Sequence, residues 1–310
     1  MYFPYLRGRQ YELLALKELV THDCINNRLI PVIEPMKPTA ALYNMIEAFV
    51  EKNKKLCILI NPEIGDFYTD LQLAVDSNSK IGTKIDEILE HENIYNGYIM
   101  NEDIVGTLKS KTDLKQYIIV NKGRDTLDSF IEVYDNILPK YTLMGNDRLC
   151  KKFISNNKVL LDDKFHKQIR NVDYLKNDDE FFSDDHLTYL EEDFVGFSDY
   201  SIVGEGYNVS GFAPIAVAIH LVYFDDNKDL RIHHFVSDSN DGIQDPGGKF
   251  GEALEKLVKW CDSKKIEHTL GLDQLYDCYK TGRYPGLGVV KKYSIMHHLE
   301  LMSKFLEGEI

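Results

Sequence analysis

The first two-thirds of the chain alternates between two patterns of hydrophobic residues. Continuous apolar runs, such as residues 29–34 and 56–61, are typical of strands buried on both faces of a parallel sheet. Between these runs, apolar side chains recur at helical spacing, as in residues 11–20 and 42–50. One run and one helix together take about 27 residues, which is the size of a β-α unit. The pattern therefore predicts alternating strands and helices.

Eight segments carry the strand pattern: the N-terminal run that ends at Arg7-Gly8, and residues 29–34, 56–61, 98–101, 117–121, 141–144, 159–163 and 194–199. Eight such strands within about 200 residues favour an α/β fold that closes into a (β/α)8 barrel of the TIM type. An open doubly wound sheet is the alternative, and the lack of a glycine-rich phosphate-binding turn after the first strand weighs against it. The helices between the fourth and seventh strands are expected to be short.

The pattern changes after Ser201. Residues 216–224 and 230–236 flank the polar turn 225–229, and together they predict a β-hairpin. From Gly248 to Leu306 the pattern is helical, with a break at 282–286. We therefore expect two domains: a (β/α)8-type barrel over 1–205 and, over 206–310, a C-terminal β-hairpin and helical appendage packed on the barrel.

Polar residues stand at the ends of nearly all the predicted strands. They are Arg7, Glu34, Asn61, Asn101, Asn121, Asn146, Asp162, Asp163 and Asp199. In a (β/α)8 barrel the carboxyl ends of the strands form the rim at which ligands bind. The alternative for each single position is that Asn and Asp cap the following helix or start a turn. The whole ring together favours a ligand site.

The residue types at these strand ends suggest separate roles. The carboxylates of Glu34, Asp162 and Asp199 are candidates for acid/base catalysis. Arg7 is suited to an anionic group, and the amides can orient a polar ligand. The ligand-binding amides would be Asn61, Asn101, Asn121 and Asn146.

Whether a metal ion binds stays open at the level of sequence. Glu34, Asp163 and Asp199 could supply the oxygen ligands that Mg2+ or Mn2+ prefers. The many amides weaken this interpretation, because they carry no charge for a hard cation. The adjacent pairs His233-His234 and His297-His298 point to different sides of a strand or helix, which is poor geometry for one metal.

Residues 165–193 form a long insertion between the seventh and eighth predicted strands. Long loops at the upper face of a barrel often act as lids, so this segment is a candidate lid over the ligand, with Arg170 as an anion contact. An acidic loop that simply faces water explains the same sequence equally well.

Composition narrows the classes of partner and the compartment. The formal net charge of −14 repels phosphate backbones and disfavours direct nucleic-acid binding. The five cysteines are scattered without a Cys-x-x-Cys pair, which disfavours disulfides and structural zinc and fits a reducing cytoplasm. No secretory leader pattern opens the chain, and no stretch approaches the roughly 18 apolar residues of a membrane span. We expect a cytoplasmic protein with no membrane partner.

Three sequence blocks resemble the Beta-protein family, a group from bacteria and phage-like mobile elements without an established reaction. The blocks are MYFPYLRGRQYE at residues 1–12, Ile33-Glu34-Pro35, and GFSDY at residues 196–200, within a similarity that spans about residues 1–240. The resemblance implies a barrel fold and an association with anti-phage defence or mobile-element loci. Arg7, Glu12, Glu34 and Asp199 stand at positions that match these blocks.

Two functional classes follow from the sequence. In the first, the barrel binds or processes a small polar or anionic ligand at its rim, within a defence or mobile-element module. In the second, a non-catalytic regulatory or scaffold protein binds a protein partner encoded nearby, through an acidic surface and the C-terminal helices. A metal-dependent nuclease is a third reading, disfavoured by the net charge of −14.

Overall fold

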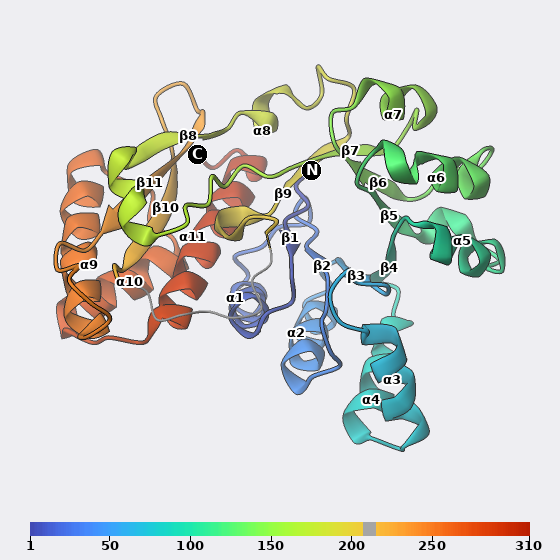
Figure 1. Ribbon diagram of the computed structural model, residues 1–310, viewed down its shortest axis with the longest axis horizontal. Helices are drawn as coiled ribbons and strands as arrows, with labels where there is room; N and C mark the ends of the chain where they lie inside the picture. The colour runs from blue at the N-terminus through green and yellow to red at the C-terminus, as the bar shows by residue number, and fades with distance from the viewer. Residues whose placement is uncertain (207–214) are drawn as a thin grey trace. The chain divides into compact units, whose positions relative to one another are not determined.

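A computed structural model describes residues 1–206 and 215–310, which form two compact units (Figure 1). We call Met1–Asp162 with Asp185–Asp199 the barrel unit. Asp163–Asp184 with Tyr200–Ile310 make the second unit. Among the described residues, no helix has both the length and the apolar character needed to cross a membrane.

The barrel unit confirms the predicted (β/α)8-type fold. Its eight strands pair in parallel in the order β1-β2-β3-β4-β5-β6-β7-β9. They are β1 (Tyr5–Leu6), β2 (Val32–Ile33), β3 (Leu56–Leu59), β4 (Ile94–Ile99), β5 (Ile118–Asn121), β6 (Tyr141–Met144), β7 (Lys158–Asp162) and β9 (Gly196–Asp199). A bridge between Tyr2 and Phe197 brings the last strand back to the N-terminal segment. The amide of Phe3 donates to the carbonyl of Phe197 at 2.8 Å.

The strands form where side chains are buried on both faces. All four residues of β3 are buried, as are all four of β5. Strand β4 begins four residues before the predicted run, because Asn96 and Gly97 interrupt its apolar pattern. A Cβ atom at Gly97 would lie 2.6 Å from a Leu59 methyl and 2.7 Å from the Cys57 sulfur, so a larger residue here would have to displace these side chains of β3.

Helices follow the strands of the barrel unit and lie on the outer side of the ring in Figure 1. They are α1 (Gln10–Thr21), α2 (Ala40–Glu51), α3 (Phe67–Asp76), α4 (Lys80–Leu89), α5 (Glu102–Lys109), α6 (Leu127–Tyr134), α7 (Arg148–Phe153) and α8 (Asp185–Thr188). Short 3-10 turns η1 (Leu114–Gln116) and η2 (Arg124–Thr126) complete the connections. The expected shortness of the helices between the fourth and seventh strands is confirmed, since α5, α6 and α7 have 8, 8 and 6 residues.

The second unit is built on a three-stranded antiparallel sheet in the order β10-β11-β8. The predicted hairpin is confirmed as β10 (Ala218–Phe224) and β11 (Leu230–Val236). The third strand, β8 (Asp179–Ser183), pairs with β11. The 3-10 segments η3 (Asn171–Lys176) and η4 (Ser201–Val203) also belong to this unit.

Helices cover both faces of this small sheet. Trp260 of α9 (Pro246–Lys264) contacts the Tyr223 and His233 rings on one face, with centroids 4.8 and 4.7 Å away. On the opposite face, Phe305 of α11 (Leu287–Glu307) lies 5.0 Å from Phe224. Successive residues of a strand alternate between faces, so the hairpin separates the two helices. Helix α10 (Leu270–Thr281) packs on α11. The three helices α9, α10 and α11 confirm the helical pattern predicted after Gly248.

The contacts divide the chain differently from the expected boundary at 205 and 206. The barrel unit ends at Asp199, and residues 163–184 belong to the second unit although they lie between two barrel strands in sequence. The segment expected as a loop or lid thus carries η3 and β8. Its acidic run is held by partners on β11: Asp179 accepts hydrogen bonds from Arg231 Nε at 2.8 Å and contacts His233 Nδ1 at 3.0 Å. That the appendage packs on the barrel stays a prediction.

Candidate functional site

The carboxyl end of β1 places Arg7 against the end of β2. Gly8, which follows Arg7, has a φ of +64°, a conformation that residues with a Cβ rarely adopt. A Cβ at Gly8 would also lie 3.1 Å from the Glu34 carbonyl oxygen. The chain then enters α1, where Glu12 accepts a hydrogen bond from the Arg9 amide at 3.1 Å and closes the first turn. Gly8 and this cap therefore fix the backbone that follows Arg7.

Arg7 and Glu34 form a buried ion pair. Their side chains are 7% and 2% exposed, and Arg7 Nη1 lies 2.5 Å from Glu34 Oε2. The Tyr5 hydroxyl donates to the same carboxylate oxygen at 2.6 Å. The other oxygen, Oε1, accepts from the Glu63 amide at 2.7 Å. Three donors, from Tyr5, Arg7 and the Glu63 amide, thus converge on the Glu34 carboxylate. This arrangement holds the Arg7 guanidinium in one position.

Two charged residues continue this pair toward solvent. Arg7 Nη1 lies 3.5 Å from Glu63 Oε2, and Lys122 Nζ lies 2.7 Å from the same oxygen. The Glu63 and Lys122 side chains are 40% and 21% exposed, in contrast to the buried pair. We call Arg7, Glu34, Glu63 and Lys122 the rim cluster. It spans the ends of β1, β2, β3 and β5 and runs from the barrel interior to the surface.

The sequence pattern alone does not single out Glu63 or Lys122. Lys122 directly follows β5, so the sequence places it just beyond a strand end. Nothing in the sequence distinguishes it from other loop lysines. Glu63 stands four residues after the last residue of β3, beyond the strand-end pattern. Its contact with Glu34 joins residues 29 apart in the chain.

Asp162 and Asp199 end neighbouring strands and are register partners across β7 and β9. Asp199 is 4% exposed and accepts a hydrogen bond from the Tyr2 hydroxyl at 2.8 Å. Burial, and then the charge of Asp199, raises the pKa of Tyr2 well above its ordinary value, so the phenol keeps its proton. Asp162 is exposed. Because they are register partners, these two carboxylates lie at adjacent strand ends, as the strand-end pattern predicts.

The four amides at the strand ends have partners within the barrel unit. Asn61 clips the next strand, donating to the Ile99 carbonyl at 2.8 Å and accepting from its amide at 2.9 Å. Asn101 caps α5 by accepting from the Ile104 amide at 3.0 Å. The role of Asn101 is the capping role that the alternative interpretation gives to single positions, whereas Asn61 links two neighbouring strands.

The remaining two amides also have partners within the barrel unit. Asn121 is fully buried and holds the turn after β5, where its oxygen accepts from Thr126 Oγ1 at 2.9 Å. The exposed Asn146 donates to Glu192. The ligand-binding role expected of the four amides stays a prediction.

Two of the predicted site residues lie in the second unit rather than in the barrel unit. Asp163 accepts hydrogen bonds from the amides of Phe165 and Glu205 at 3.2 and 2.8 Å. Arg170 is exposed and pairs with Asp173 at 3.2 Å. The structure therefore does not group Asp163 with Glu34 and Asp199 within one unit.

The sequence leaves metal binding open, and the described residues add little in its favour. No three His, Cys, Asp or Glu side chains in residues 1–206 and 215–310 come together in a group that could hold a metal ion. In the rim cluster, an arginine and a lysine already neutralise the two carboxylates. Such a donor set suits a polar or anionic molecule better than a divalent cation.

Comparisons with family models, curated proteins and solved structures found no match for the chain. Its function therefore has to be argued from its own residues.

Proposed function

We propose that the protein binds, as substrate or effector, a small polar ligand with an anionic group at the carboxyl end of its barrel. The observation that carries this proposal is the buried Arg7–Glu34 pair and its continuation to Glu63 and Lys122 at the surface. The rim formed by the strand ends is the place where (β/α)8 barrels bind ligands.

A contribution to stability does not by itself explain the buried Arg7–Glu34 ion pair. Removing two charges from water costs several kcal/mol per ion, and apolar residues of similar size often serve a core equally well. The pair instead holds an arginine at a strand end in a fixed orientation. A preorganised guanidinium of this kind binds carboxylates and phosphates with little loss of entropy on binding.

Each member of the cluster has a role in this proposal. Lys122 is the cation that the ligand meets first, because it is more exposed than Arg7. Its present partner, Glu63, exchanges places with the anionic group of the ligand. Glu34 positions Arg7, with Tyr5 and the Glu63 amide fixing the carboxylate. Asp162 and Asp199, on the β7 and β9 side, accept hydrogen bonds from the polar remainder of the ligand.

The scaffold reading lacks the observation that would favour it. It requires an exposed apolar patch on the helices after Lys249. Among the described residues of that region, Tyr279 is the one large apolar side chain that is well exposed. The setting in an anti-phage or mobile-element locus, implied by the resemblance to the Beta-protein family, and the cytoplasmic location stay predictions.

Thermal unfolding against a ligand panel tests the proposal. The panel holds inorganic phosphate, citrate, sugar phosphates and nucleotides, each with and without Mg2+ or Mn2+. A ligand that binds the folded state alone stabilises it by about 2.7 kcal/mol at a hundredfold excess over Kd. We expect at least one anion to raise the midpoint, and we expect Lys122→Met to remove most of that shift.

Lys109→Met is the matched control, because Lys109 also pairs with a glutamate on the barrel unit, at 2.6 Å from Glu132, but lies away from the strand ends. It should leave the shift unchanged. Equal losses in both variants, or no shift with any anion, would contradict a site at the rim. A shift that requires Mg2+ would point back to metal-assisted binding.

A further inference from the structure

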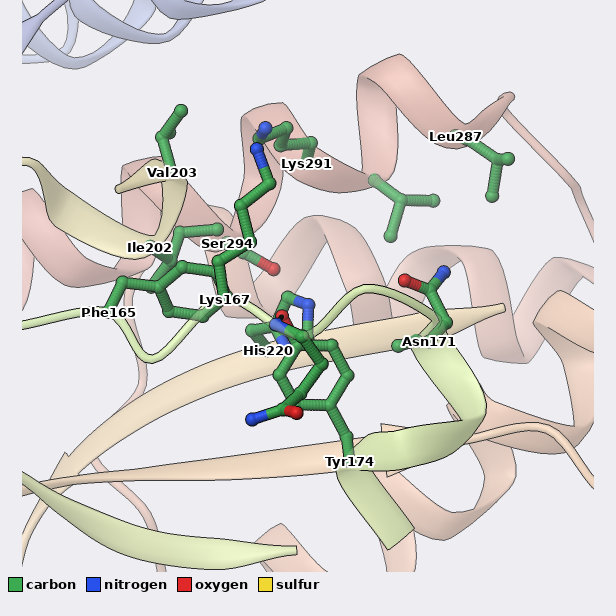
Figure 2. Close-up of a pocket in the computed structure, with 13 residues that line it drawn as sticks. Phe165, Lys167, Asn171, Tyr174, Ile202, Val203, His220, Leu287, Lys291 and Ser294 are labelled. Atoms are coloured by element: carbon green, nitrogen blue, oxygen red, sulfur yellow. Dashed lines mark hydrogen bonds between the residues drawn. The ribbon is translucent and has the colours of Figure 1, made fainter. Parts of the chain in front are cut away.

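The second unit contains a cavity of about 250 Å³ that is separate from the rim cluster in sequence and in composition. It lies between α11, the face of β10 that carries His220, and the segment that leads into η3 (Figure 2). The volume is close to the lower end of the range for small-molecule sites, about 300 Å³, so the occupant is a compact molecule.

Aromatic and aliphatic side chains form one part of its wall. Phe165 and Tyr174 pack on the imidazole of His220, with centroid distances of 5.1 and 4.7 Å. Ile202 and Val290 add aliphatic surface. A wall of this kind favours a planar ring.

Two lysines supply positive charge to the same cavity. Lys167 and Lys291 both line it, from the segment before η3 and from α11. Figure 2 shows both side chains on the same side of the cavity, above His220. Lys291 is near enough to His220 to contribute to the fall in the pKa of that ring. No acidic side chain lines the cavity among the described residues, so its charge favours an anion.

A chain of hydrogen bonds behind the cavity assigns the state of His220. Glu180 Oε1 lies 3.4 Å from His234 Nε2, and His234 Nδ1 lies 2.7 Å from His220 Nδ1. The carboxylate favours a proton on His234 Nε2, which leaves His234 Nδ1 as the acceptor. His220 Nδ1 is then the donor, and His220 Nε2 keeps its lone pair.

Burial keeps this assignment valid at neutral pH. Burial first, then the neighbouring His234 and Lys291, lowers the pKa of His220 well below its ordinary value, so the ring stays neutral. His220 therefore brings a hydrogen-bond acceptor to the lining of the cavity.

The hydroxyl of Ser294 is a further polar group at the cavity. Ser294 is 2% exposed and lines the cavity from α11. Its side chain points toward His220 in Figure 2. This hydroxyl can donate or accept a hydrogen bond, so it gives a ligand a second polar contact beside His220.

We propose that this cavity is a binding site for a small single-ring organic anion. The ring packs on Phe165 and Tyr174, the anionic group meets Lys167 and Lys291, and a hydroxyl or N–H of the ligand donates to His220. The site is independent of the rim cluster, because none of its lining residues belongs to the barrel unit.

Isothermal titration of the full chain tests this proposal with probes that separate ring from charge. Phenyl phosphate and 4-hydroxybenzoate carry both a ring and an anion, and their relative affinity distinguishes a phosphate site from a carboxylate site. Inorganic phosphate carries the anion alone, and 4-hydroxybenzyl alcohol carries the ring and hydroxyl without charge. We expect at least one ring anion to bind more tightly than both partial probes.

Neighbouring lysines on one helix provide the matched variants. Lys291→Met should weaken the ring anion about tenfold, whereas Lys292→Met, at the next position of α11 and outside the cavity lining, should not. Lys167→Met should act like Lys291→Met, and Ser294→Ala should weaken binding less. Lys122→Met, at the rim, should have no effect, so failure here and failure of the rim proposal are distinguishable.

Three results would overturn the proposal. One is the absence of binding by either ring anion up to millimolar concentration. Another is inorganic phosphate binding as tightly as phenyl phosphate, because the aromatic wall would then play no part. The third is an equal loss in Lys291→Met and Lys292→Met with unchanged circular dichroism.

Discussion

At the scale of single residues, the Arg7–Glu34 pair is a buried pair of opposite charges in the barrel unit. Both side chains are almost fully buried, so each charge depends on the other for compensation. Tyr5 and the Glu63 amide satisfy the carboxylate further, but they cannot neutralise it. The pair therefore stabilises little as a whole and becomes costly when it is broken.

Arg7→Met should destabilise the barrel unit by about 3–5 kcal/mol, because it leaves Glu34 as an uncompensated buried charge. The double variant Arg7→Met/Glu34→Met, which removes both charges, should recover most of that loss. Native-state hydrogen exchange of amides in β3 and β5 measures both effects on the barrel unit itself. Costs that simply add in the double variant would show that the two side chains are not coupled.

Residue types at strand ends could be predicted from the sequence, but their partners could not. Arg7, Glu34, Asp162 and Asp199 do stand at the carboxyl ends of barrel strands. The division between a cap, such as Asn101, and a charged cluster depends on contacts between residues far apart in the chain. The Lys122–Glu63 contact joins residues 59 apart, and no local pattern announces it.

At the scale of elements, α10 approaches the backbone of α11 closely at Gly271. A Cβ there would meet the Tyr293 carbonyl oxygen and lie 2.6 Å from the His297 amide nitrogen, both in the backbone of α11. The Leu270 amide also donates to Glu300 of α11 at 2.7 Å. Backbone atoms cannot move aside as a side chain does, so glycine is required at this contact.

Gly271→Ala should therefore destabilise the second unit by about 1–3 kcal/mol, the usual cost of overpacking. Gly251→Ala in α9 is the control, since a Cβ there meets nothing within 4 Å and should stabilise the helix by about 0.5–1 kcal/mol. Urea unfolding followed by Trp260 fluorescence reports on this unit. An equal effect of the two substitutions would refute the close approach.

The alternation of strands and helices could be predicted because each barrel element has a local hydrophobic period. The same reasoning missed β8, whose sequence Asp-Glu-Phe-Phe-Ser is mostly polar. Its polar side chains are accommodated by distant residues, as when Tyr223 donates to Asp179 at 2.7 Å. A polar strand whose partner lies about 50 residues further on leaves no periodic signal of its own.

At the scale of the whole molecule, the second unit contains histidines whose burial favours the neutral imidazole. Burial lowers the pKa of His297 to about 4, although its hydrogen bond to the Val222 carbonyl acts in the opposite direction. Burial also lowers the pKa of His220 and His234 in the same unit.

Acid should therefore weaken the second unit before the pH reaches 4. Between about pH 6.5, the ordinary pKa of His, and the folded value of about 4, the unfolded state binds more protons than the folded one, so stability falls as pH falls. His297 alone should cost about 2 kcal/mol between pH 7 and pH 5. His297→Gln should flatten this dependence of the unfolding free energy, and substitution of the exposed His268 should not.

The measurement that tests the central claim most directly is hydrogen–deuterium exchange of the full chain with and without the anion that most raises its unfolding midpoint. We predict slower exchange at the strand ends that carry the rim cluster, in peptides around residues 5–9, 61–66 and 120–126, and no such protection in Lys122→Met. Protection confined to peptides around 165–174 and 287–294 would place that anion in the cavity of the second unit and contradict a ligand site at the barrel rim.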